Sequence, residues 1–306
     1  MIRLEGLTRK FGGFTAVDDL TFEVKEGEIF GLLGPNGAGK TTTVRMLCCL
    51  IKPTSGKAFV GGYEVGKDSI KIREIVGFLP ESPGLYGELS ARRNLEFYSK
   101  LYGVPKQKRE ENIERFLKML DLWNRRDDPV GTFSKGMQQK IAIARSMVHE
   151  PKVLFLDEPT AALSPDSAKI VRDFILELKY EKRTIFLCTH NLYEVERICD
   201  RAAVLNTKLA AFGSPIDLER KFGSTKTEVQ LKKVDKKIAS AVKRLRRVRG
   251  VQVVDDTLLV DTEDPDAVNP EIVKAIVKHG GKIRYVTRTA HGLEEAYLKL
   301  VKKDEV

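Results

Sequence analysis

Residues 34–42 read Gly34-Pro35-Asn36-Gly37-Ala38-Gly39-Lys40-Thr41-Thr42 and match G-x-x-x-x-G-K-[ST], the pattern of a phosphate-binding loop. The pattern requires a strand before it and a helix after it. Residues 28–33 predict a buried strand, and residues 42–47 begin a helix. Glycines let backbone N–H groups turn towards one anion, and the helix N-terminus adds the positive end of its dipole. Lys40 supplies a charge for the outer phosphates, and Thr41 a hydroxyl for Mg²⁺. We therefore expect a bound nucleoside triphosphate.

Two adjacent acids follow another predicted buried strand, at residues 153–156. Open parallel sheets bind ligands at the carboxyl ends of their strands. We expect Asp157 to hold Mg²⁺ through water and Glu158 to orient or deprotonate an attacking water. A third apolar strand ends in His190, which therefore lies at the same edge and is a candidate for hydrogen bonding a γ-phosphate.

Two further residues have alternative interpretations. Phe11 stands just before Gly12-Gly13, where an aromatic ring stacks on a base or fills a small β core. Glu81 follows the predicted strand 75–80 and is either a functional carboxylate or a solvated loop residue.

Helical periodicity begins near residue 89. Ser90 is a predicted N-cap for a helix over 91–101, and Pro105 begins a second helix. Ser134 and Gly136 precede the predicted helix 138–148, where they bind a second anion or form an ordinary N-cap.

The composition is that of a soluble globular protein. The chain has 306 residues, 42% hydrophobic and 31% charged, which suits about two domains of roughly 150 residues. No apolar run approaches the roughly 20 residues that span a bilayer, and the N-terminus lacks the apolar core of a signal peptide, so we expect a cytosolic chain. The four cysteines lack metal-ligand spacing and predict buried or free thiols. The net charge of +10 favours an anionic partner, lipid or nucleic acid, or simply a lysine-rich surface.

Together, these motifs resemble the ATP-binding subunit of ABC transporters over residues 1–220. Residues 34–42 resemble the Walker A motif, 153–158 resemble Walker B with its catalytic glutamate, His190 resembles the switch histidine and Phe11 the adenine-stacking aromatic. The resemblance implies an α/β P-loop NTPase core with an antiparallel β subdomain and an inserted helical subdomain. It also implies an active ATPase that uses ATP and Mg²⁺, with Lys40, Glu158 and His190 in catalysis and Thr41, Glu81 and Asp157 on the metal.

The same resemblance implies partners. Two subunits, identical or similar, sandwich two ATP molecules, and the signature loop of one closes over the phosphates held by the other. Here that loop corresponds to Ser134, Lys135, Gly136 and Met137. Such subunits drive a separate polytopic membrane subunit from the cytoplasmic face of the cell membrane. Small domains similar to residues 223–306 follow the ATPase in some exporter subunits, which favours export.

Three positions depart from the family pattern. Glu81 replaces a glutamine, although a carboxylate also ligates Mg²⁺. The signature keeps the serine and the second glycine of Leu-Ser-Gly-Gly-Gln, and Leu163-Ser164 stands where Leu-Asp is usual.

The domain boundaries follow from breakers and periodicity. We expect an ATP-binding domain at 1–222, with its helical subdomain at about 82–149, and an accessory α+β domain at 223–306. The tail reads β-α-β-β-α-β, a ferredoxin-like order, with helices over 235–248 and 270–278 and a last helix over 293–301. Its first helix predicts a solvated basic face, or a surface for anionic lipid or RNA. We interpret this domain as regulatory or dimer-supporting.

Two other functions compete with transport. Soluble ABC-type ATPases act on ribosomes or nucleic acid, but those usually fuse two ATPase domains or carry a long coiled coil. This chain has one Walker A motif and no long heptad segment, so we expect no nucleic acid partner. The altered signature and Ser164 suggest a third function, a nucleotide switch that does not hydrolyse.

Overall fold

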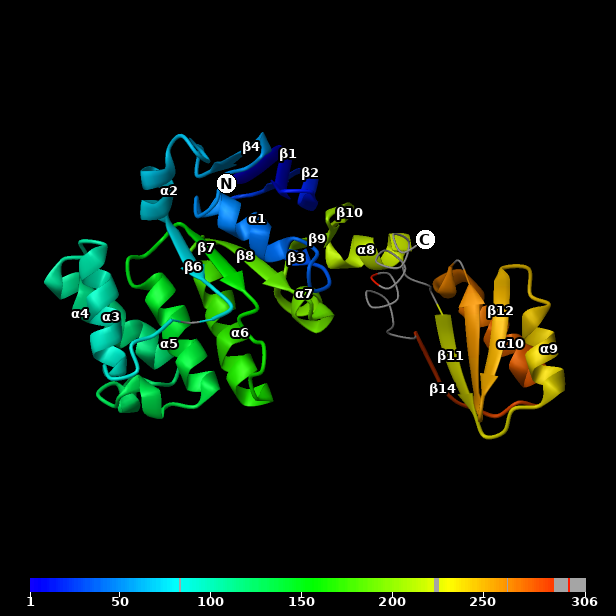
Figure 1. The fold of residues 1–306 in the computed structure, drawn as a ribbon. Helices are drawn as coiled ribbons and strands as arrows, with labels where there is room; N and C mark the ends of the chain where they lie inside the picture. Colours follow the sequence, from blue (N-terminus) through cyan, green and yellow to red (C-terminus); the bar gives the residue numbers. More distant parts are fainter. Residues whose placement is uncertain (83, 223–225, 263, 289–296, 298–306) are drawn as a thin grey trace. The chain divides into compact units, whose positions relative to one another are not determined.

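The computed structural model describes residues 1–82, 84–222, 226–262, 264–288 and 297 (Figure 1). The chain divides into two compact units, residues 1–215 and 216–306. Most of helix α8 (Pro215–Phe222) belongs to the second unit, whereas the boundary predicted from the sequence lies after residue 222.

A four-stranded antiparallel sheet begins the first unit. Its strand order is β2-β1-β4-β5. Burial alternates along β1, where Ile2 and Leu4 face the core and Arg3 and Glu5 face solvent, as period-2 patterning predicts. The strands are β1 (Ile2–Phe11), β2 (Phe14–Val24), β4 (Ser55–Val60) and β5 (Tyr63–Glu64).

A six-stranded sheet carries the functional motifs. Its order is β10-β9-β3-β8-β7-β6, and only the pairing of β10 with β9 is antiparallel. All residues of β3, β7 and β8 are buried, because both faces of the sheet are covered. The carboxyl ends of these three parallel neighbours therefore meet at one edge. The strands are β3 (Ile29–Leu33), β6 (Val76–Leu79), β7 (Val153–Asp157), β8 (Thr184–Thr189), β9 (Arg201–Asn206) and β10 (Lys208–Gly213).

Some helices pack around this sheet, and others form a separate group at one side of it (Figure 1). Those nearest the motifs are α1 (Lys40–Leu47), α6 (Pro165–Tyr180) and α7 (Leu192–Ile198), and α2 (Ser69–Ile75) precedes β6. The helical group contains α3 (Ala91–Leu101), α4 (Lys106–Met119) and α5 (Lys135–Met147), which confirms that three helices form where they were predicted. Helix α5 begins at Lys135 rather than at residue 138, because Ser134 caps it. Ser90 caps α3 as predicted by accepting a hydrogen bond from the N–H of Arg93. Across the described ranges, no helix is both long and apolar enough to cross a membrane.

His149 connects the helical group to the sheet. Its ring stacks on Tyr102 at the end of α3, with centroids 3.7 Å apart, and its Nε2 lies 3.0 Å from the carbonyl oxygen of Val76 in β6. The pKa of His149 is lowered to about 4, mainly by burial and to a smaller extent by the charge of Arg183, although the Val76 contact opposes both. The imidazole is therefore neutral at physiological pH.

We expect this buried histidine to destabilise the protein in acid. Because the folded pKa is depressed, the free energy of unfolding falls as the pH drops from 6.5 towards about 4. The loss attributable to His149 is at most about 1.4 kcal/mol per pH unit. His149→Phe keeps an aromatic ring against Tyr102 but cannot titrate. Chemical denaturation of both proteins across this range should therefore give a shallower pH dependence for the variant, and parallel curves would contradict the prediction.

Besides most of α8, the described residues of the second unit form one antiparallel sheet of four strands, in the order β12-β13-β11-β14, and two helices. Its core includes Val229, Ile238, Val260 and Ile272. The chain order is β-α-β-β-α-β, as the sequence predicts. The elements are β11 (Lys226–Leu231), α9 (Lys236–Lys243), β12 (Val248–Val254), β13 (Thr257–Thr262), α10 (Pro265–Lys278) and β14 (Ile283–Arg288).

Two helix boundaries in this unit were wrong. The helix predicted over 235–248 ends at Lys243, because tight turns follow and Val248 already pairs with Thr262 of β13. Beyond the end of the helix, Arg246 and Arg247 lie in the turn and Arg249 lies in β12, so these three residues do not belong to its basic face. Helix α10 begins at Pro265 rather than 270, because Asp264 caps it by accepting from the N–H of Ala267. The helix predicted over 293–301 falls outside the described residues, apart from residue 297.

The four cysteines are free, as predicted. Cys48, Cys188 and Cys199 are buried, and Cys49 is half-buried. Burial raises the pKa of the Cys48, Cys188 and Cys199 thiols. These thiols are therefore protonated and unreactive at neutral pH.

Candidate active site

The phosphate-binding loop connects β3 to α1 through a space that admits only glycine at two points. A Cβ atom on Gly34 would lie 2.4 Å from the carbonyl oxygen of Leu205 in β9. A Cβ atom on Gly39 would lie 2.4 Å from the carbonyl oxygen of Ala16 in β2, and Gly39 has a φ of +99°. The glycines thus allow the loop to pass close to two neighbouring strands before the helix begins.

Lys40 folds back over this loop. Its ammonium group donates hydrogen bonds to the carbonyl oxygens of Gly34 (2.6 Å) and Pro35 (3.1 Å). The same nitrogen lies 3.8 Å from Oε1 of Glu158. The side chain is almost fully buried, so its positive charge is fixed at the mouth of the loop.

Asp157 ends β7 beside the first turn of α1. The Thr41 hydroxyl donates a hydrogen bond of 2.7 Å to Asp157 Oδ2. Burial raises the pKa of Asp157, and the charges of Glu158 and Glu81 add to this effect, whereas Thr41 and Lys40 oppose it. A buried carboxylate close to two other carboxylates is a favourable position for a cation.

Glu158 lies between two side chains at the end of β8. His190 Nδ1 is 2.8 Å from Glu158 Oε1, and the Thr189 hydroxyl donates to Oε2 at 3.2 Å. The backbone of Glu158 has a φ of +50°, a left-handed conformation that costs a non-glycine residue about 1–3 kcal/mol. The carboxylate is therefore held in one orientation by its backbone and by two neighbours.

A cleft of about 380 Å³ contains this site. Phe11 and Glu81 both line it, and Phe11 is 45% exposed rather than packed in a β core. The Arg9 guanidinium lies 4.3 Å from the centre of the Phe11 ring. Phe14, which no sequence motif marks, is opposite Phe11 in the β1–β2 pairing and also lines the cleft. Thr189, which donates to Glu158, carries no sequence signal either. The cleft is lined by Phe11, Phe14, Ala16, Pro35, Asn36, Gly37, Ala38, Gly39, Lys40, Thr41, Thr42, Glu81, Asp157 and Glu158.

Residues 134–137 are not among the described residues that line the cleft. Ser134 is the N-cap of α5 and accepts a hydrogen bond from the N–H of Met137. A Cβ atom on Gly136 would lie 3.5 Å from Leu163 and from Ser167, so this segment packs against the start of α6. Within one chain, the predicted signature loop and the phosphate-binding loop therefore contribute to different surfaces.

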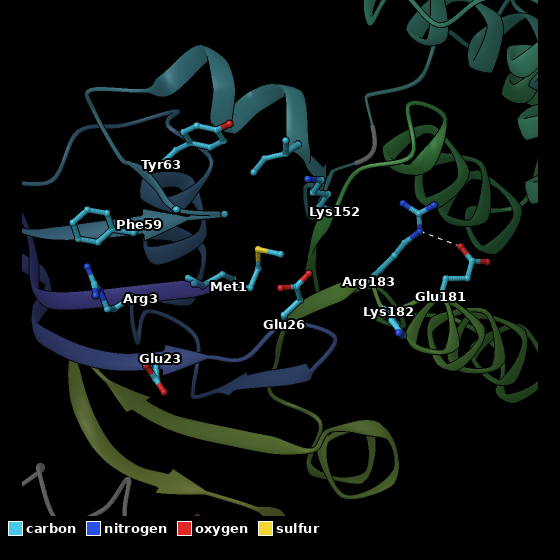
Figure 2. Close-up of a pocket in the computed structure, with 14 residues that line it drawn as sticks. Met1, Arg3, Glu23, Glu26, Phe59, Tyr63, Lys152, Glu181, Lys182 and Arg183 are labelled. Atoms are coloured by element: carbon cyan, nitrogen blue, oxygen red, sulfur yellow. Dashed lines mark hydrogen bonds and ion pairs between the residues drawn. The ribbon is translucent and has the colours of Figure 1, made fainter.

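A larger cavity, about 950 Å³, is lined by a different set of residues (Figure 2). Lys152 and Arg183 line it, and they directly precede β7 and β8, so the cavity lies at the opposite edge of the sheet. Its charged residues are of both signs, and Arg183 already pairs with Glu181. The smaller cleft holds the candidate catalytic groups.

The donor set beside the phosphate-binding loop fits Mg²⁺. Thr41, Glu81 and Asp157 offer one hydroxyl and two carboxylates around the same cleft, and Mg²⁺ prefers such oxygen ligands. A bound cation would offset the free-energy cost of burying Asp157 as an anion.

Replacement of Asp157 should separate stability from metal use. Because burial raises the folded pKa, the ionised carboxylate destabilises the protein near neutral pH, and this cost disappears as the pH falls through that pKa. Asp157→Asn can still accept the Thr41 hydrogen bond. We expect a higher Tm for the ligand-free variant near neutral pH, no difference in strong acid, and loss of Mg²⁺-dependent ATPase activity. A lower Tm than wild type near neutral pH would contradict this account.

Comparisons with known proteins agree on one family. A family model described as ABC transporter matches residues 17–161. The chain is 34% identical to the linearmycin resistance ATP-binding protein LnrL of Bacillus subtilis (strain 168), over 85% of each chain. It is 33% identical to the bacitracin transport ATP-binding protein BcrA of Bacillus licheniformis, over 98% of this chain and 97% of that one. A solved ATP-binding subunit of an ABC transporter matches with a TM-score of 0.68 and 31% identity, over 73% of this chain and 93% of that one.

Proposed function

This chain belongs to the ABC transporter family and is an ATP-binding transport ATPase, and we propose that it powers export through a separate polytopic membrane subunit. The convergence of Lys40, Asp157 and Glu158 on one cleft carries the proposal. The relatives named for linearmycin resistance and bacitracin transport support export. The chain would lie peripherally on the cytoplasmic face of the cell membrane.

The site residues have distinct proposed roles in hydrolysis. Residues 34–42 bind the ATP phosphates through backbone N–H groups, and the Lys40 ammonium leaves the loop carbonyls for the outer phosphates. Thr41, Glu81 and Asp157 would hold Mg²⁺, which when bound offsets phosphate charge. Phe11 stacks on the adenine.

Glu158 then orients the attacking water. With both ring nitrogens protonated, His190 donates from Nδ1 to the Glu158 carboxylate and from its other ring nitrogen to the γ-phosphate. In-line attack gives ADP and phosphate.

The position of residues 134–137 supports an ATP-dependent dimer. Because this loop lies outside the cleft of its own chain, we propose that Ser134, Lys135, Gly136 and Met137 contact ATP bound to a second subunit, identical or similar. Leu163 and Ser164, which begin the segment against which the loop packs, would lie at that interface. The domain at 216–306 would support or regulate the dimer.

The proposal is tested by gentle detergent purification of the tagged chain from native membranes. We expect a polytopic membrane protein to copurify in a fixed ratio, and ATPase activity to depend on both Mg²⁺ and the complex. Recovery with ribosomes or nucleic acid, lost on nuclease treatment, would overturn the transport role. A Lys40→Ala chain that still binds the membrane protein but does not hydrolyse ATP is the control for assembly.

A further inference from the structure

A buried ion pair joins two helices behind the site. Arg172 lies in α6 and Glu194 in α7, and the guanidinium donates a hydrogen bond of 2.7 Å to Glu194 Oε1. The exposed fractions of the two side chains are 12% and 3%. The second carboxylate oxygen, Oε2, is buried and has no hydrogen-bond partner within the described residues.

The two helices are the ones that follow the catalytic strand ends. Helix α7 begins two residues after His190, with Asn191 as its N-cap, and α6 begins after the loop that follows Glu158. His190 and Glu158 are themselves 2.8 Å apart. The Arg172–Glu194 pair therefore links α7, which follows His190 in the chain, to α6, which follows Glu158.

Helix α7 depends on such contacts for its position. It has seven residues, and an isolated helix of that length is not stable in water. Val195 and Ile198 pack it inwards, and Val195 approaches Gly31 of β3. The directional hydrogen bond from Arg172 to Glu194 adds to this packing a constraint on the position of the helix along its axis.

Stability alone does not account for this pair. Removing two charges from water is costly, and burial raises the pKa of Glu194 although Arg172 and Arg197 oppose that rise. Buried ion pairs are often replaced by apolar residues without loss of stability. A pair that also leaves one carboxylate oxygen unsatisfied is thus better explained by the geometry that it enforces.

We infer that Arg172 and Glu194 are positioning residues that hold His190 in register with Glu158. The inference rests on the roles proposed for His190 and Glu158. Neither positioning residue touches nucleotide in this account, so both act on the rate of hydrolysis and not on ATP binding.

The test replaces Glu194 and separates kcat from KM. Glu194→Leu should lower kcat about five- to tenfold, a smaller loss than the roughly 10²-fold that a 1 Å misplacement of a catalytic group can cause. The KM for ATP should stay within about twofold. Glu194→Gln keeps an acceptor for Arg172 and should recover most of the lost kcat. Arg172→Met removes the donor, should match Glu194→Leu, and carries the same test if the leucine variant does not fold.

Two comparisons distinguish positioning from general destabilisation. Glu28 is also buried and paired with an arginine, Arg201, but it lies before β3 at the opposite edge of the sheet. Glu28→Leu should lower the Tm without lowering kcat. In a His190→Ala background, Glu194→Leu should cause no further loss of the residual rate.

Three results would overturn the inference: a wild-type kcat in Glu194→Leu, a raised KM with unchanged kcat, or an undiminished effect in the His190→Ala background. The proposed function is tested separately: copurification of a membrane protein tests the transport role, and wild-type ATP hydrolysis by His190→Ala and Glu158→Gln would remove the roles proposed for those two residues.

Discussion

Glu158→Gln should bind ATP normally, hydrolyse it about 10²–10³-fold more slowly and accumulate as an ATP-bound dimer. Glutamine has the shape of glutamate and can keep the Thr189 contact, but it lacks the charge that interacts with Lys40 and the basicity that activates water. Because the phosphate-binding loop is untouched, nucleotide affinity should change little. The ATP-bound dimer then persists, because the ATP hydrolysis that would separate the two subunits is blocked.

The measurement combines steady-state ATPase assays with size-exclusion chromatography in the presence of Mg²⁺ and ATP. Lys40→Ala is the matched control, since it removes a phosphate contact and should stay monomeric under the same conditions. Normal turnover by Glu158→Gln would remove Glu158 from the role assigned to it. A variant that hydrolyses slowly but never dimerises would contradict the two-subunit arrangement.

Gly39→Ala should abolish ATP binding and lower the Tm strongly. The added methyl group would lie 2.4 Å from the carbonyl oxygen of Ala16 and 3.0 Å from a methyl group of Val17. Backbone cannot yield as a flexible side chain does, so the loop must move away from β2. The positive φ adds about 1–3 kcal/mol of strain. Both effects act at the residue that directly precedes α1.

Gly37→Ala separates the two contributions. Gly37 also has a positive φ, +84°, but a Cβ atom there meets nothing within 4 Å. We expect this variant to lose only about 1–3 kcal/mol of stability and to retain measurable ATP binding. Thermal unfolding with and without ATP compares the stability and the ATP binding of Gly37→Ala and Gly39→Ala directly. Equal losses in the two variants would show that backbone strain, and not the close approach to β2, determines the effect.

The sequence predicts which side chains meet at one edge of the sheet, because its signals are local. The phosphate-binding loop, the acids after β7 and the histidine after β8 each follow a short apolar run. Once those runs form parallel strands, their ends meet without further information. The folding of residues 91–101 into one helix is equally local, since Ser90 caps it.

Features that depend on tertiary packing could not be predicted in this way. The pattern of α9 continues to Val248, but pairing with β13 takes that residue into a strand. Phe14 gives no motif and acquires its place only through the β1–β2 pairing. Arg172 and Glu194 are 22 positions apart and each resembles an ordinary surface charge until α6 and α7 come together.

The burial of the native thiols makes the chain suitable for site-specific labelling. Three of its four cysteines are inaccessible and protonated, and the fourth is half covered, so maleimide dyes should react slowly with the folded protein. A cysteine introduced at an exposed position, such as Tyr180→Cys, would therefore react first without removal of the original four. Fluorescence energy transfer between such labels on two chains could then follow their approach and separation during a single turnover.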